Sequence, residues 1–181
     1  MTDEIKAGYD ISAILHEMRE EYWQGLAVAE ETQQELLECV VFTLGGETYA
    51  FETIYAAEVL RIPRLVKVPQ VQDLIVGIFN LRGVITAAMD IRPLLGLSSP
   101  PLTAQGRLLV VKSDKFITGI LAESVQGVIG LSFETFEPGI KTLSPARQQL
   151  IRGQFNQDET LIILLDMTAL LASPEIMVGQ Q

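Results

Sequence analysis

Few side chains in this 181-residue sequence have the types and spacing that covalent or metal chemistry requires. His16 and Cys39 are its only imidazole and thiol, and a segment with a helical pattern separates them. No Ser/His/Asp order, CxxC, HExxH or phosphate-cradling glycine loop accompanies them. We therefore expect neither to be a nucleophile or a ligand, and we predict no catalytic residue, no metal site and no cofactor.

The most informative polar residues, Asn80-Leu81-Arg82-Gly83, lie between two apolar runs, Val76–Phe79 and Val84–Met89. Runs of this kind are typical of buried strands. The arginine must either form an ion pair, with Glu58 or Asp90 as candidates, or point toward a partner.

The neighbours of Arg82 have simpler expected roles. We expect Asn80 to hydrogen-bond the backbone of the turn. Gly77 and Gly83 suit close backbone approach or positive φ, and Gly77 is also a place where a docking helix would find room. Asp90 and Asp166 each precede a short helical pattern and are expected to cap it.

The elements around these residues are mostly short strands. Residues 10–37 have a helical stripe of apolar side chains, and from Glu38 onward the pattern changes to a period of two. Predicted strands cover 40–44, 47–51, 54–61, 74–81, 84–90, 108–112, 116–122, 124–131, 150–155 and 161–165, with short helices at 91–95 and 167–171. Such spacing indicates small barrels or a sandwich, and no internal repeat stands out.

Charge is unevenly distributed along the chain. The net charge is −10; residues 1–38 hold ten acidic residues against Lys6 and Arg19, and the rest holds thirteen acidic against eleven basic residues. No basic patch for nucleic acid or an anionic membrane surface is visible, and no run is long enough to span a membrane. The single cysteine and the acidic N-terminus without an apolar core favour a cytoplasmic protein without a signal peptide.

From Glu38 to Leu171 the chain resembles the CheW family, the adaptors of bacterial chemosensory arrays. The resemblance rests on a pattern of segments: Phe42–Phe51, Ala56-Ala57-Glu58-Val59, Pro69, Gly77–Gly83, Asp90-Ile91-Arg92, Gly119–Val125, Ile151-Arg152-Gly153 and Leu164-Leu165-Asp166. The acidic N-terminal segment is similar to that of adaptors of the pilus-type (twitching) systems, including PilI.

The resemblance implies a mostly β fold of two side-by-side five-stranded SH3-like barrels with an N-terminal helical extension. The domains are then an acidic extension at 1–37, a CheW-like domain at 38–173 and a tail at 174–181, which we expect to fray. The resemblance also implies that the protein is a non-catalytic adaptor for signal transduction. Such an adaptor binds the regulatory domain of a CheA-type histidine kinase and the cytoplasmic tip of a methyl-accepting receptor.

The residues expected at the partner-binding surface follow from the same resemblance. They are Ala56, Glu58, Gly77, Asn80, Arg82, Gly83, Ile120 and Ala122. For Ile120 and Ala122 a place in the core is the default expectation, and a place in the wall of a binding groove is the alternative. Other functions also stay open: a CheW-like competitor or regulator, a generic SH3-like module for polyproline peptides, and an enzyme, for which the sequence shows no clustered reactive side chains.

Overall fold

The period-two pattern of the sequence appears in the structure as burial of alternate residues along the strands. In the strand from Ile75 to Leu81, Ile75, Gly77 and Phe79 are buried, while Val76 and Ile78 between them are partly exposed. The computed structural model describes residue 19 and residues 35–71, 73–140 and 144–177. The chain divides after Glu35 into two units, and the strands lie in the second. The predicted helix at 10–37 lies outside the described residues, apart from Arg19 and residues 35–37. At that end the prediction was wrong, because Leu36 and Leu37 belong to the first strand.

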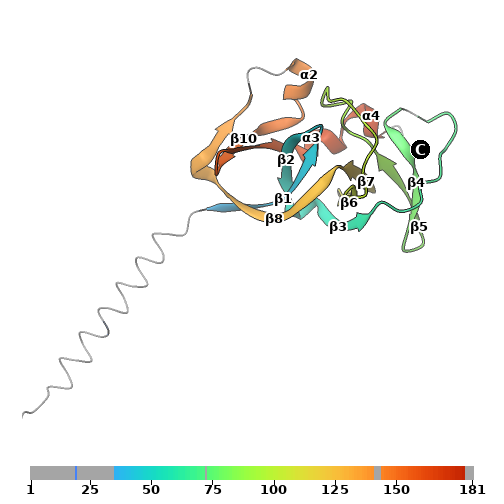
Figure 1. Ribbon diagram of the computed structural model, residues 1–181, viewed down its shortest axis with the longest axis horizontal. Helices are drawn as coiled ribbons and strands as arrows, with labels where there is room; N and C mark the ends of the chain where they lie inside the picture. Colours follow the sequence, from blue (N-terminus) through green and yellow to red (C-terminus); the bar gives the residue numbers. More distant parts are fainter. Residues whose placement is uncertain (1–18, 20–34, 72, 141–143, 178–181) are drawn as a thin grey trace, which may run out of the picture. The chain divides into compact units, whose positions relative to one another are not determined.

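The elements of the second unit follow one another as short strands with brief helices (Figure 1). The strands are β1 (Leu36–Leu44), β2 (Glu47–Glu52), β3 (Ala56–Arg61), β4 (Ile75–Leu81), β5 (Val84–Met89), β6 (Arg107–Lys112), β7 (Ile117–Ala122), β8 (Ser124–Ser132), β9 (Phe136–Pro138), β10 (Ile151–Gln157) and β11 (Thr160–Leu165). The α-helices are α2 (Pro145–Gln148), α3 (Met167–Leu171) and α4 (Pro174–Met177), and the 3₁₀ turns are η1 (Thr53–Tyr55) and η2 (Phe133–Thr135).

The strands form two sheets, which confirms the mostly β fold predicted from the sequence. One sheet has the order β8-β1-β2-β11-β10-β9, and the other has the order β3-β6-β7-β5-β4. Pairing is antiparallel except for β11 with β2 and β5 with β7, which are parallel. One apolar cluster takes residues from both sheets, including Phe42 and Ile120. Two further clusters, around Phe155 and around Phe79, each belong to one sheet.

Some local predictions were wrong. The stretch 91–95 is a hydrogen-bonded turn rather than a helix, with Gly96 N–H donating to the carbonyl of Pro93 and Leu97 N–H to that of Arg92. Strand β9 was missed, because three residues carry too little periodicity. Helix α2 lies within residues 133–149, where the lack of a clear period predicts a loop with short helical turns. Pro174–Met177 is helical, and Ile176 is fully buried, so this part of the expected tail is packed on the core.

The expectation that the chain has no internal repeat was also wrong. Ile75-x-Gly77-x-Phe79-Asn80 recurs as Ile151-x-Gly153-x-Phe155-Asn156, and each copy is followed by an aspartate and a Leu-Leu pair. The strands correspond as β1 to β6, β2 to β7, β3 to β8, β4 to β10 and β5 to β11, with every pairing preserved. The register agrees as well, since Leu164↔Ala50 in one sheet matches Ala88↔Gly119 in the other.

Each repeat is divided between the two sheets, because the chain passes from one sheet to the other after the second strand of the repeat. Strand β3 follows β2 along the chain but pairs with β6 in the other sheet, and β8 follows β7 but pairs with β1. Each sheet therefore combines the first two strands of one repeat with the last three corresponding strands of the other.

Candidate partner-binding surface

The tip of the β4–β5 hairpin carries the arginine that the sequence singled out. Strand β4 ends at Leu81 and β5 begins at Val84, so Arg82 and Gly83 form a two-residue turn. Their φ angles of 51° and 90° both lie in the left-handed region, as a type I′ turn requires. The Gly83 N–H donates to Asn80 Oδ1 at 2.6 Å. The expected backbone role of Asn80 and the need for positive φ at Gly83 are thus confirmed.

Arg82 forms the ion pair with Glu58 that the sequence offered as one alternative. Its Nη2 lies 3.0 Å from Glu58 Oε2, and the two side chains are 82% and 24% exposed. Glu58 belongs to β3 and Arg82 to the β4–β5 turn, so the pair joins the two opposite ends of the five-stranded order. Contact between these ends requires the sheet to curl on itself. An ion pair this exposed contributes at most about 1 kcal/mol to stability.

The strand beside Arg82 exposes apolar side chains that sequence reasoning did not select. Val84 and Ile85 are 64% and 67% exposed. Ile85 is the cross-strand partner of Asn80, so the two side chains lie side by side on the outer face of the hairpin. An exposed cation flanked by exposed aliphatic side chains is typical of surfaces that bind proteins. The sequence did contain a sign of this exposure. Val84 and Ile85 are consecutive, and because successive strand residues point to opposite faces, at most one of the two can face the core.

Three residues predicted at the partner-binding surface lie inside the protein instead. Ile120 is 1% exposed and Ala122 is fully buried, and both belong to the core cluster shared by the sheets. A Cβ on Gly77 would lie 2.9 Å from the carbonyl oxygen of Val66, so the space beside this glycine is taken by the chain itself. Glu58, Asn80, Arg82 and Gly83 come together at the hairpin tip, and Ala56 is half-buried on the same strand as Glu58.

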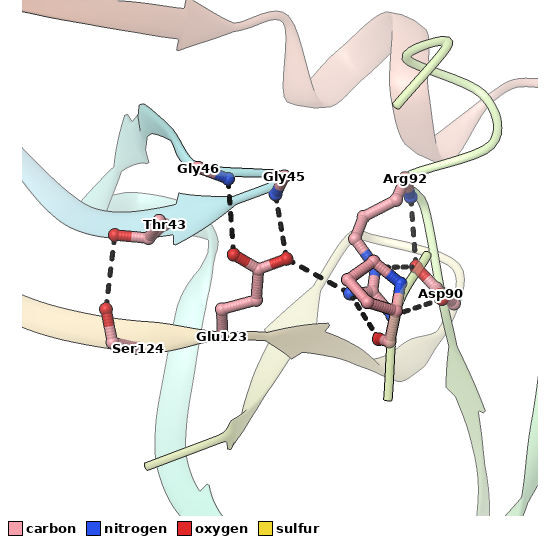
Figure 2. Close-up of polar contacts among 8 residues, drawn as sticks. Thr43, Gly45, Gly46, Asp90, Arg92, Glu123 and Ser124 are labelled. Atoms are coloured by element: carbon pink, nitrogen blue, oxygen red, sulfur yellow. Dashed lines mark hydrogen bonds and ion pairs between the residues drawn. The ribbon is translucent and has the colours of Figure 1, made fainter. Parts of the chain in front are cut away.

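A second polar cluster is built around Arg92, which is only 3% exposed (Figure 2). Asp90 accepts two side-chain hydrogen bonds from its guanidinium, at 2.9 and 2.8 Å. The Arg92 Nη1 donates to Glu123 Oε1 at 3.1 Å and to the carbonyl of Pro100 at 3.0 Å. Asp90 also accepts the Arg92 backbone N–H at 3.1 Å, so it stabilises the turn that follows β5.

Glu123 lies between Arg92 and the glycine turn of the β1–β2 hairpin (Figure 2). Its two carboxylate oxygens accept the N–H groups of Gly45 and Gly46, at 2.9 and 3.3 Å. Burial of the carboxylate raises its pKa, but the Gly45 N–H and the Arg92 guanidinium outweigh this, and the pKa of Glu123 is lowered. Through Glu123 the cluster connects the β1–β2 turn of one sheet with the turn after β5 of the other. Every charged side chain in the cluster is paired, so none of them is a free acid or base.

The described residues offer no arrangement for metal or thiol chemistry. Among them no group of three or more His, Cys, Asp or Glu side chains is placed to hold a metal ion. Cys39 is fully buried, and this burial, together with the nearby Glu52, raises the pKa of its thiol to about 12. His16 lies outside the described residues. Within the described ranges, no helix has the length and apolar character to cross a membrane.

Comparison with known proteins now adds to this geometry. The family model of the CheW-like domain matches residues 38–175. Protein PilI of Pseudomonas aeruginosa is 29% identical over 141 residues, which cover 76% of this chain and 79% of PilI. Chemotaxis protein CheW of Klebsiella aerogenes is 26% identical over 154 residues, covering 84% and 93% of the two chains. The crystal structure of the scaffolding protein TtCheW from Thermoanaerobacter tengcongensis superimposes with a TM-score of 0.68 at 24% identity, covering 77% of this chain and 95% of TtCheW.

Proposed function

Because this chain belongs to the family of chemotaxis scaffold proteins with a CheW-like domain, we propose that it couples methyl-accepting receptors to a CheA-type histidine kinase. It would do so without chemistry of its own, by binding both proteins at receptor arrays on the cytoplasmic side of the membrane. The 29% identity with PilI favours a pilus-type system. The competing hypothesis, a CheW-like regulator that occupies one partner without the other, predicts binding to only one of them.

The observation that carries this proposal is the side chain of Arg82. The β10–β11 turn of the second repeat corresponds to the Arg82-Gly83 turn and has the same left-handed backbone, since Asp158 and Glu159 have φ of 48° and 63°. That conformation costs a non-glycine residue about 1–2 kcal/mol, and asparagine tolerates it better. The exposed ion pair with Glu58 does not offset this cost. An arginine here is therefore better explained by contact with a partner than by stability.

The test measures binding to both partners at once. We expect Arg82→Asn to keep the fold, because asparagine suits the left-handed turn, and to weaken binding of a receptor-tip fragment by ~1–2 kcal/mol, or roughly tenfold. Arg82→Ala should weaken binding equally. Arg64→Asn is the matched control, since Arg64 is also exposed and lies elsewhere. Isothermal titration with the receptor fragment and with the kinase of the same bacterium gives both affinities. Unchanged affinity of Arg82→Asn for both partners would contradict the proposal.

A further inference from the structure

The internal repeat allows two equivalent places in the molecule to be compared. The first is the Arg92 cluster, where the β1–β2 turn meets Glu123 and the turn after β5; we call it the filled site. Its counterpart lies where the β6–β7 turn meets Ile54 and helix α3. By repeat equivalence Gly45 corresponds to Asp114, Glu123 to Ile54 and Arg92 to Thr168. The counterpart is a pocket of about 670 Å³, which we call the open site.

The filled site shows what covers this position. Arg92 and Glu123 span it with an ion pair of 3.1 Å. The side chain of Leu97 lies against the glycine turn, 3.0 Å from where a Cβ on Gly45 would be. A charged group and an aliphatic side chain, both from the chain itself, therefore cover the filled site on the side of the turn after β5. A pocket of about 620 Å³ remains on its other side, between the glycine turn, Glu123 and residues 98–105.

The open site lacks both groups. Thr168 and Ile54 replace the ion pair, and Ile54 is 71% exposed. Ser173 stands at the position of Leu97, and the chain continues from it into α4. The buried side chains of Met167 and Leu171 form an apolar wall. The hydroxyls of Tyr55 and Thr168 form a hydrogen bond of 3.0 Å at the edge of the open site, so a neutral contact stands where the counterpart has its ion pair.

The charge at the rim of the open site is also reversed. The filled site presents the carboxylate of Glu123 beside a neutral glycine turn. The rim of the open site carries Lys112 and Lys115 against one acid, Asp114. Both lysines are exposed, and neither ammonium forms an ion pair within the described part of the chain. In a chain of net charge −10 this local excess of positive charge favours an acidic partner.

We infer that the open site binds an acidic segment of a partner protein, with a large aliphatic side chain in the pocket and flanking carboxylates on Lys112 and Lys115. In the filled site Leu97 supplies an aliphatic side chain and Arg92 a positive charge. In the open site the partner segment would supply the aliphatic side chain and a negative charge. The open site shares no residue with the Arg82 surface, so it is a second docking surface and stands whether or not the proposed function holds.

The experiment uses the full chain and two fluorescein-labelled synthetic peptides of equal length with the same central leucines. One peptide has glutamates beside the leucines and the other has lysines. We expect the glutamate peptide to bind, with an affinity that falls at high salt, and the lysine peptide to bind at least tenfold more weakly. Amide NMR shifts should be confined to residues 112–116, Ile54 and α3.

Three variants separate this site from other surfaces. Ile54→Glu with Thr168→Arg installs the ion pair of the filled site and should abolish binding. Lys112→Gln with Lys115→Gln should weaken binding by roughly fivefold to tenfold, whereas Lys67→Gln, an exposed lysine elsewhere, should not change it. Arg82→Asn should also bind the peptide normally. Equal affinity for the two peptides, no binding of the glutamate peptide, or undiminished binding by a folded Ile54→Glu/Thr168→Arg protein would each overturn the inference.

Discussion

At the scale of single residues, Arg92 is important for the stability of the fold because its charge is buried. Its guanidinium is enclosed by Asp90, Glu123 and the carbonyl of Pro100. A buried ion pair adds little compared with a well-packed apolar replacement of both partners, but removing one partner leaves the other charge buried and unpaired.

We therefore expect Arg92→Met to lower the free energy of unfolding by about 3–5 kcal/mol. Urea titration followed by circular dichroism measures the change. Arg107→Met is the control, because that guanidinium donates to three carbonyls of its own loop and forms no ion pair in the described structure. We expect it to cost about 1 kcal/mol. Equal losses for the two variants would show that Arg92 is held by packing and not by charge.

The same cluster predicts a dependence of stability on pH. The pKa of Glu123 is lowered from its ordinary value of 4.5, so as pH falls the unfolded state takes up this proton before the folded state does. The carboxylate thus stabilises the fold above about pH 4.5, and this contribution is lost as pH falls through the lowered pKa. Glu123→Gln should flatten the fall in stability below pH 4.5, whereas Glu159→Gln, at an exposed hairpin tip, should leave it unchanged. Urea midpoints measured across this range test the prediction; parallel curves for all three proteins would refute it.

At the scale of elements, the repeated hairpins depend on a glycine at the same place. A Cβ on Gly153 would lie 2.4 Å from the carbonyl oxygen of Glu137, and one on Gly77 lies 2.9 Å from that of Val66. In both repeats a backbone segment crosses the hairpin there, β9 in one and the Val66–Ile78 bridge in the other.

Alanine at either glycine should therefore displace the crossing segment. We expect Gly77→Ala and Gly153→Ala to destabilise the fold by ~1–3 kcal/mol, with the larger loss at Gly153 because its contact is closer. Gly130→Ala is the matched control, since its nearest neighbour is the end of the Leu36 side chain at 3.2 Å, which has room to move. Thermal melts compare the three; a loss at Gly130 as large as at Gly153 would contradict the explanation.

The same elements show what the sequence can and cannot predict. The Gly45-Gly46 turn and the Arg82-Gly83 turn were predictable, because local backbone requirements are written in consecutive residues. The neighbour that fills the space beside Gly77 could not be predicted, since Val66 comes close to this glycine only through the tertiary structure. For the same reason the sequence left both the core and a groove wall open for Ile120 and Ala122, and the structure buries both in the core. Strand alternation tells which residues share a face but not which face meets the other sheet.

At the scale of the whole molecule, the division of each repeat between the two sheets makes the repeats depend on each other. The first repeat supplies β1 and β2 to one sheet but β3, β4 and β5 to the other. The second repeat likewise supplies β6 and β7 to one sheet and β8, β10 and β11 to the other. Neither repeat alone contains a complete sheet, and the largest apolar cluster takes residues from both repeats, so folding of the two sheets should be a single cooperative transition.

Cutting the chain between the repeats tests this dependence. Pro101 and Leu102 lie between β5 and β6, outside any strand, so fragments 1–101 and 102–181 each keep all strands of one repeat. We expect each fragment alone to lack dispersed amide NMR signals, because β1 would lack β8 and β6 would lack β3. Mixing the two should restore the spectrum of the intact chain in a one-to-one complex, since the lost connection lowers only the effective concentration of the partner. If either fragment alone unfolds cooperatively in urea, the repeats are independent domains and the sharing of sheets between them does not couple their folding.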